Sequence, residues 1–303
     1  MANLKKAEVI ADGASMGQET VEYVKGSLTD EEIGKTVSLL KVVWPDAGFT
    51  REYINWLYRE NPSGRAEIFN AWDKGEIVAH YAAIPVKARL FGELEKGLLS
   101  LNIAVSPAHR ARGYFKALGS RTFESACERG FGFAAGVANA NSTLLFRRQL
   151  RFQLVCPLDV KIGAGPIARS PGRGGEERDY IQSWDGQTLS WRLRRPGAKY
   201  RCIKRVGSMS VFAHTGKYGI WAVMNDIDPA GVAPPEAGHL RWNPLNVWIG
   251  LNPEYDWAKS AYINLPERFK PSPLNLIFRD LTGRGRVLDP QKTVFSLLDF
   301  DAY

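Results

Sequence analysis

The beginning of the chain contains two apolar patterns with helical spacing. In "LTDEEIGKTVSLLKVVWP", apolar residues recur every three or four positions after Thr29 or Asp30, either of which can cap a helix, and Pro45 ends the pattern. The stretch "TREYINWLYRENPSG" repeats this arrangement, with Thr50 as the cap and the turn residues 61–64 as the stop. We therefore expect two successive amphipathic helices.

The pattern then changes to apolar runs that are typical of strands. "AEIFNAW", "EIVAHYAAIPVKARLF" and "GLLSLNIAV" follow one another and are joined by short glycine-containing turns, which favours an antiparallel meander. After them come a helical pattern closed by Gly130, the buried strand "FGFAAGVAN", the short helix "NSTLLFRRQL" and the strand "FQLVCPLDVKI". This order predicts an α/β or α+β domain with a mixed sheet.

A change of composition separates this domain from the rest of the chain. "GAGPIARSPGRGGEERD" is rich in Gly, Pro and charge, as expected of a linker, and strand-like runs such as "GIWAVMNDI" and "PLNLIFRDL" follow it. We therefore expect four parts: a polar segment over 1–28, an α/β domain over 29–160, a linker over 161–179 and a second α/β domain over 180–303.

Composition and charge narrow the functional classes. Hydrophobic residues make up 45% of the 303 positions, which excludes a disordered chain. Forty basic against thirty-two acidic residues give a formal charge of +8, which favours an anionic ligand. Nucleic acid, phosphorylated cofactors and anionic sugars all stay open, and scattered basic residues are also typical of a soluble surface.

The cysteines indicate a reducing compartment. Cys127, Cys156 and Cys202 are odd in number and widely spaced, so neither a disulfide framework nor a zinc site is expected, and we predict no metal.

The first residues lack a signal-peptide core, and no apolar run approaches the ~20 residues that span a bilayer. We expect a cytoplasmic protein that does not bind a membrane.

One junction carries the clearest candidate chemistry. In "VSPAHRARGYFKAL", a strand ends before Pro107, and Arg110 and Arg112 precede Gly113 at the start of a helix. A helix N-terminus offers free N–H groups and partial positive charge, and glycine lets the backbone approach a ligand closely. The predicted ligand is a pyrophosphate.

This loop and the elements around it resemble the GNAT superfamily of acyl-CoA-dependent N-acyltransferases over roughly residues 29–160. The family's loop, Q/R-x-x-G-x-G/A, is matched by Arg110, Ala111, Arg112, Gly113, Tyr114 and Phe115, although Phe115 stands where Gly or Ala is usual. The resemblance implies a GNAT-like mixed, mostly antiparallel sheet flanked by helices. It also implies acyl-CoA, by default acetyl-CoA, as the cosubstrate. "LSWRLRRPGAKY", "SPLNLIFRDL" and "LLDFDAY" resemble the ends of large GNAT-like proteins and indicate a second, degenerate GNAT-like domain.

The resemblance also implies which backbone and side chains bind the coenzyme. The main chain of the strand before the loop, here Ile103, Ala104 and Val105, binds the pantetheine arm, and one of its N–H groups polarises the thioester for direct attack by an amine. Asn139 or Asn141 would bind the pantetheine amides, although an Asn at a strand end also serves as a helix cap.

The acid and the base of the reaction are less clearly marked. The family's usual acid, a Tyr, aligns with Phe146, which cannot donate a proton, so either the thiolate leaves unassisted or Tyr114 or another hydroxyl replaces it. Where the family often has an acidic residue, this chain has the neutral Asn102. His80 on the preceding strand is the candidate base, although a lone strand histidine is commonly structural.

The acceptor and the rival functions stay open at this point. We expect a small-molecule amine, with an amino sugar suggested by aromatics that would line a site between the domains, although these also suit a core: Trp242, Trp248, Tyr255 and Trp257. The rivals are an inactive CoA-binding protein, a basic nucleic-acid-binding module and an aminoacyl-tRNA-dependent ligase on a tandem GNAT-like scaffold. Nucleic-acid-binding motifs are absent from the sequence, a ligase would not need the loop, and the oligomeric state is not predicted.

Overall fold

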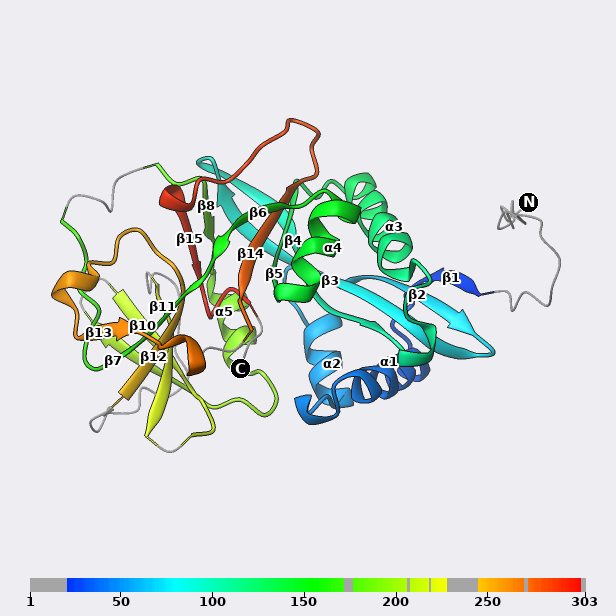
Figure 1. Cartoon of the computed structure of the whole chain (residues 1–303), viewed down its shortest axis with the longest axis horizontal. Helices are drawn as coiled ribbons and strands as arrows, with labels where there is room; N and C mark the ends of the chain where they lie inside the picture. The colour runs from blue at the N-terminus through cyan, green and yellow to red at the C-terminus, as the bar shows by residue number, and fades with distance from the viewer. Residues whose placement is uncertain are drawn as a thin grey trace.

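The computed structural model describes residues 21–171, 177–205, 208–217, 219–227, 245–269 and 272–300. Figure 1 shows two halves side by side, with the N-terminal half on the right. The elements of this half are β1 (Glu22–Lys25), α1 (Asp30–Val43), α2 (Arg51–Tyr58), β2 (Glu67–Asp73), β3 (Glu76–Leu90), β4 (Glu93–Val105), α3 (Tyr114–Glu128), β5 (Phe133–Ala138), α4 (Ala140–Leu150) and β6 (Gln153–Pro157). The two expected N-terminal helices, the meander and the crossover helix are confirmed.

Within its described residues, the second half contains one α-helix and strands of three to eight residues. Its elements are β7 (Asp159–Gly163), β8 (Tyr180–Gln182), α5 (Gly186–Leu193), β9 (Tyr200–Arg205), β10 (Ser208–His214), β11 (Ile220–Ile227), β12 (Leu245–Leu251), β13 (Tyr262–Asn264), β14 (Asn275–Asp280) and β15 (Thr293–Ser296). The antiparallel strands β9, β10 and β11 are followed by β12, which is parallel to β11. The first half has the same order, since β5 lies parallel to β4 after the meander of β2, β3 and β4.

Local capping explains where the first two helices begin. The side chain of Thr29 accepts a hydrogen bond from the backbone N–H of Glu32, and that of Thr50 accepts one from Tyr53. Each cap satisfies a donor that the first helical turn leaves without an intrahelical partner.

The helices of the first half cover both faces of its sheet. Successive side chains of β3 alternate between the two layers: Ala82 and Ile84 pack in the cluster that includes α1 and α2, whereas Tyr81 and Ala83 pack in the cluster that includes α3 and α4. This is the period of two that a strand imposes. The sheet is therefore buried on both sides.

One C-terminal strand crosses into the N-terminal half. β14 lies between β5 and β6 and pairs antiparallel with both, as Figure 1 shows. Farther along the same sheet, β8 and β15 connect β3 to β12. The expected boundaries 29–160 and 180–303 stay a proposal, because the two halves share strands across the linker.

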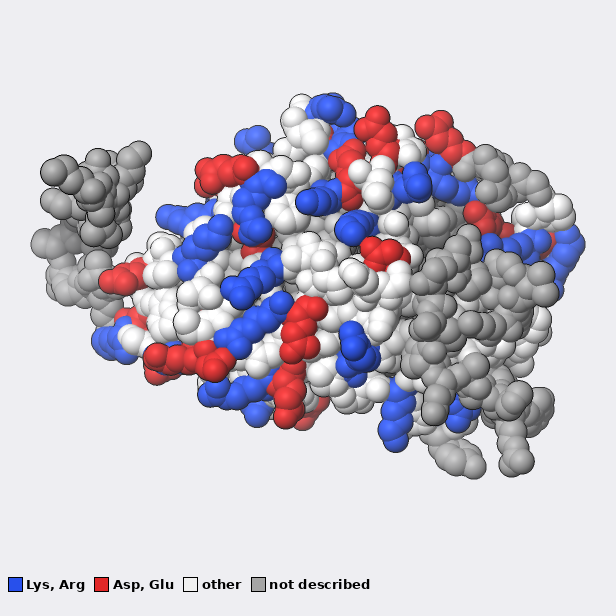
Figure 2. All heavy atoms as spheres, turned by 180° about the vertical axis from the view of Figure 1, so that it is seen from behind, with Lys and Arg blue, Asp and Glu red and all other residues white. Residues whose placement is uncertain are grey.

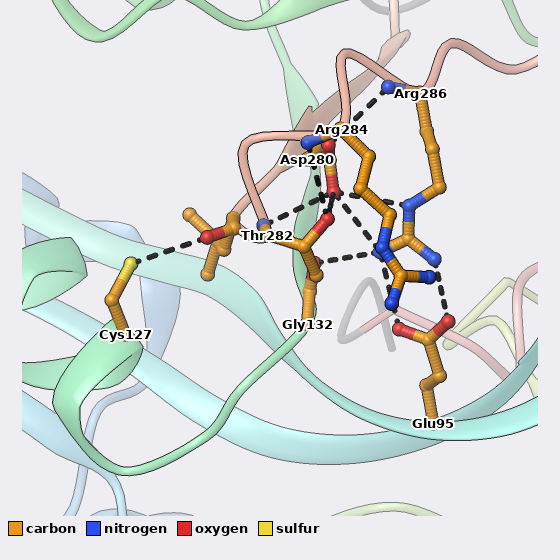
Figure 3. A network of polar contacts seen from close by, with 8 residues as sticks. Glu95, Cys127, Gly132, Asp280, Thr282, Arg284 and Arg286 are labelled. Carbon is orange, nitrogen blue, oxygen red and sulfur yellow. Dashed lines mark hydrogen bonds and ion pairs between the residues drawn. The ribbon is translucent and has the colours of Figure 1, made fainter.

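Arg286 fastens the end of this crossing strand (Figure 3). Its guanidinium donates hydrogen bonds to Glu95 at the start of β4, to Asp280 at the end of β14 and to the carbonyl of Gly132. Burial opposes the charged form of Asp280, but hydrogen bonds from Thr282 and Arg286 outweigh it and lower its pKa to about 2. The cluster therefore joins two β-strands that lie far apart in the sequence.

We expect Arg286→Ala to destabilise the protein by about 3 kcal/mol, because Glu95 and Asp280 would be left partly buried without their cation. Arg284→Ala, in the same loop but at an exposed position, is the matched control and should change the free energy of unfolding by less than about 0.5 kcal/mol. Urea unfolding at neutral pH measures both. Equal stability of the two variants would contradict the role of Arg286.

Candidate functional site

β4 and β5 separate toward their C-terminal ends. Their parallel pairing runs from Gly97 with Phe133 to Ser100 with Gly136. β4 then continues to Val105, while the end of β5 pairs on its other side with β14, as Ala138 does with Asn275. The last residues of β4 thus have no counterpart on β5 in the part of the sheet that the structure describes.

A β-bulge accompanies this separation. The register between β3 and β4 shifts between His80 and Ala82, and Asn102 on β4 has a left-handed φ of 50°. Asn tolerates this conformation better than most residues, and bulges commonly re-aim side chains beside sites. The predicted pantetheine-binding residues, Ile103 to Val105, lie in the strand segment that follows, where Ile103 and Val105 are half-buried and Ala104 is buried.

The predicted phosphate loop is exposed and leads directly from this segment to a helix. A hydrogen bond from the Ser106 N–H to the Val78 carbonyl holds the end of β4, and residues 110–113 are all exposed. Ala111 and Gly113 have φ values of 63° and 78°, and α3 begins immediately afterwards. Of the residues described, none caps α3 with its side chain. The first N–H groups of this 15-residue helix are therefore suited to an anion.

The two aromatic residues of the motif face inward. The ring of Tyr114 lies 6.1 Å from that of Tyr23, and only 5% of Tyr114 is exposed. Phe115 meets Phe146 edge to face at 5.1 Å. Phe146, which the sequence aligned with the family's acid, therefore fills the core beneath α3 and α4.

The two candidate asparagines lie at the start of α4. The side chain of Asn139 accepts a hydrogen bond of 2.8 Å from the Ser142 N–H and caps the helix, and Asn139 and Asn141 are both exposed. The side-chain oxygen of Asn139 is therefore already engaged in capping α4.

His80 lies on the other face of the sheet from Tyr114, so the structure does not bring these two candidates together. The imidazole is fully buried, with Nε2 3.0 Å from the Tyr58 hydroxyl and Nδ1 2.7 Å from the Asn70 side-chain oxygen. Burial lowers its pKa to about 3. The side-chain amide of Asn102 donates a hydrogen bond of 3.1 Å to the Tyr58 hydroxyl. His80 is thus neutral and reaches the bulge of β4 only through Tyr58.

A cavity of about 590 Å³ opens beside this bulge. Its walls include Phe49, Thr50 and Glu52 at the start of α2, Asn102 of β4, and residues 195–197 in the turn after α5. Both halves of the chain therefore form it. Sequence reasoning missed this cavity, and it also missed Tyr58.

Two tryptophans fix the helices that border this cavity. Trp56 of α2 and Trp191 of α5 stack at 4.6 Å, and each indole N–H donates to the backbone carbonyl of the other residue, at 2.9 and 3.0 Å. This reciprocal contact joins α2 to α5.

The aromatics proposed for sugar binding form a separate cluster. Trp248 and Tyr255 are 1% and 6% exposed and pack with Trp257, Phe212 and Val223. Trp248 and Tyr255 are therefore core residues, as the alternative interpretation of these aromatics predicted. Trp242 lies outside the described residues. The packing of Trp248 into the core makes its faces inaccessible to a sugar ring.

Comparisons with known proteins agree with this geometry. Residues 26–147 match the family model of an acetyltransferase (GNAT) domain. A probable N-acyltransferase from Enterococcus faecalis has a similar structure, with a TM-score of 0.56, 10% identity and coverage of 86% of this chain and 73% of that one. Eis1 from Mycobacterium abscessus gives a TM-score of 0.55 at 13% identity, covering 86% and 74%. A tandem GNAT protein from the clavulanic acid biosynthesis pathway gives 0.51 at 10% identity, covering 86% and 99%.

These findings confirm the resemblance to the GNAT superfamily and the mixed, mostly antiparallel fold flanked by helices. At such identities the likeness to solved structures shows the fold alone. No curated protein matches the sequence. In the part of the chain that the structure describes, no helix is long and apolar enough to span a membrane.

The buried neutral His80 should make stability depend on pH. Its folded pKa of about 3 lies below the ordinary value of 6.5, so the unfolded chain binds the extra proton and stability falls as pH drops below 6.5. At pH 5 this linkage costs about 2 kcal/mol relative to pH 7.5. His80→Gln should lose that part of the pH dependence, as urea unfolding at both pH values would show. An identical pH dependence in the two proteins would contradict a neutral His80.

Proposed function

We propose that this protein transfers an acetyl or another acyl group from acyl-CoA to the amine of a small molecule. The observation that supports this most strongly is the exposed, uncapped start of α3, which follows directly on the part of β4 that has separated from β5. A diphosphate fits the first site and an extended amide-containing chain fits the second. CoA contains both groups in that order.

The residues of the junction would hold this substrate mainly through the backbone. The N–H groups around Gly113 would bind the diphosphate, with positive charge from Arg110 and Arg112 nearby. The main chain of residues 103–105 would pair with the pantetheine amides, and one N–H there would polarise the thioester carbonyl as negative charge develops on its oxygen. Asn139 and Asn141 would contribute from the start of α4, and Ala111, Tyr114 and Phe115 complete the loop.

The cavity beside Asn102 would hold the acceptor. It adjoins the bulge of β4, so an amine bound there would approach the thioester from the side of α2. His80, the candidate base, is buried with its pKa lowered to about 3 and reaches the cavity only through Tyr58 and Asn102, so we propose that it orients the acceptor rather than taking its proton. An amino sugar remains one proposed acceptor, with Thr50 and Glu52 as polar partners in place of the aromatics. The cytoplasmic location expected from the cysteines belongs to the same proposal.

Tyr114, the candidate acid, is buried on the opposite face of the sheet from His80 and would have to turn outward to reach the thiolate. A thiolate with an ordinary pKa near ~8.5 can leave without an acid. The buried Phe146 favours a second candidate, a CoA-binding protein without transferase activity. Release of free thiol from acetyl-CoA in the presence of amines would distinguish the two.

The surface carries the excess of basic residues that the sequence predicts. Figure 2 shows one face, on which many Lys and Arg side chains lie close together with Asp and Glu among them and at their edges. Positive charge suits CoA and nucleic acid alike, so the proposal of CoA rests on the junction between β4 and α3.

We expect acetyl-CoA to raise the melting temperature of the wild-type protein, and Gly113→Glu to abolish that shift, because a carboxylate would face the diphosphate. Gly130→Glu is the matched control. Both glycines are exposed, have φ values of 78° and 76°, and have no described atom within 4 Å of the place that a Cβ would take, but Gly130 lies beyond the other end of α3. Its variant should keep the shift. Loss of the shift in both variants, or in neither, would contradict the assigned site, and a shift with oligonucleotides alone would favour nucleic acid.

A further inference from the structure

We infer that Asn102 positions the acceptor amine, and that a buried chain of hydrogen bonds starting at Glu32 fixes which atom of its side chain faces the amine. This inference rests on the proposed acyl transfer and adds the class of group that the cavity accepts. The chain runs from Glu32 through Asn70, His80 and Tyr58 to Asn102, which lines the cavity.

Glu32 sets the direction of the chain. One carboxylate oxygen accepts hydrogen bonds from the backbone N–H groups of Ser27, at 2.7 Å, and Leu28, at 2.8 Å. The other accepts one from the side-chain Nδ2 of Asn70 at 2.6 Å. Both oxygens of Glu32 accept in this arrangement, so the NH₂ group of Asn70 faces the carboxylate and the oxygen of Asn70 faces away from it.

That orientation fixes the tautomer of His80. The oxygen of Asn70 lies 2.7 Å from Nδ1, which must therefore carry the proton. Because the ring is neutral, Nε2 is an acceptor, and the Tyr58 hydroxyl at 3.0 Å must donate to it. The direction of each hydrogen bond follows from the one before it.

The same logic fixes the side chain of Asn102. The single proton of the Tyr58 hydroxyl is engaged by His80, so the group that approaches its oxygen from Asn102 at 3.1 Å must be a donor, Nδ2. The side-chain oxygen Oδ1 then points away from Tyr58. Since Asn102 is half-buried and lines the cavity, Oδ1 is the atom that it can present there.

An oxygen acceptor at this place favours a ligand that has a donor group, and in the proposed transfer that donor is the N–H of the attacking amine. The amine would donate one N–H to Oδ1 and keep its lone pair for the thioester carbon, which lies beyond the same bulge in the proposed complex. In the transfer, the C–N bond forms from that lone pair, the C–S bond breaks with its electrons on sulfur, and the proton lost by nitrogen passes through solvent to the thiolate. Asn102 is thus a positioning residue, and the inferred acceptors are amines that carry at least one N–H and attack in their neutral form.

Glu32→Gln tests the chain from its far end. The glutamine oxygen should keep the place that accepts from the N–H groups of Ser27 and Leu28, so its NH₂ group would face Asn70 and turn the amide of Asn70 around. The hydrogen bonds as far as Asn102 would then reverse. The direct readout is the ¹⁵N spectrum of His80, in which we expect the proton on Nδ1 in the wild type and on Nε2 in the variant.

The kinetic readout uses acetyl-CoA with glucosamine, lysine and spermidine, and follows the amine that the wild type turns over fastest. We expect Glu32→Gln and Asn102→Ala each to raise the KM for the amine about tenfold, the cost of one hydrogen bond to the ligand. The two effects should not add in the double variant. The KM for acetyl-CoA and the CoA-induced thermal shift should stay unchanged. Glu31→Gln, at the exposed neighbouring position, is the control and should behave as the wild type.

Several results would overturn the inference. One is a wild-type His80 protonated on Nε2, and another is a reversed tautomer in Glu32→Gln with an unchanged KM for the amine. Full additivity of Glu32→Gln and Asn102→Ala would also contradict it. If none of the three amines is acetylated while acetyl-CoA still raises the melting temperature, the proposed transfer reaction is wrong instead. The ¹⁵N spectrum of His80 then still shows whether the chain of hydrogen bonds has the inferred direction.

Discussion

The separation of β4 from β5 is the constraint on which the rest of the structure depends. Parallel pairing ends at Ser100 and Gly136, and after the bulge at Asn102 the remaining residues of β4 pair with β3 but not with β5. This leaves backbone groups of one strand available to a ligand and aims that strand at the exposed start of α3. It also brings the side chain of Asn102 to the cavity beside α2. One backbone irregularity therefore adjoins both the proposed coenzyme site and the proposed acceptor site.

The second half of the chain completes this arrangement. β14 occupies the free edge of β5, so β5 is paired with the C-terminal strand where it is no longer paired with β4. The stacked Trp56 and Trp191 hold α5 against α2, and the turn after α5 forms one wall of the cavity. The N-terminal half alone would thus lack both a strand of its sheet and one wall of the proposed acceptor cavity, neither of which the match of a GNAT domain to residues 26–147 includes.

The sequence predicted those features that depend on neighbouring residues. The caps at Thr29 and Thr50, the meander and the loop at Arg110 to Gly113 are local patterns, and the structure contains them. The place of β14 could not be predicted, because it depends on pairing with a strand more than a hundred residues away. The chain of hydrogen bonds from Glu32 to Asn102 could not be predicted either, because its members come from two helices and three strands. Only the fold brings them together. His80 was chosen as a base from its residue type and its place on the strand before β4, and its partners changed that interpretation to a buried, neutral group that acts through Tyr58.

A crystal structure grown with saturating CoA would test the central claim most directly, because it locates both ends of the coenzyme at once. Our account predicts the diphosphate within hydrogen-bonding distance of the N–H groups at the start of α3, and the pantetheine arm in the space between β4 and β5. CoA bound at any other place, or a start of α3 without CoA in such a crystal, would contradict it.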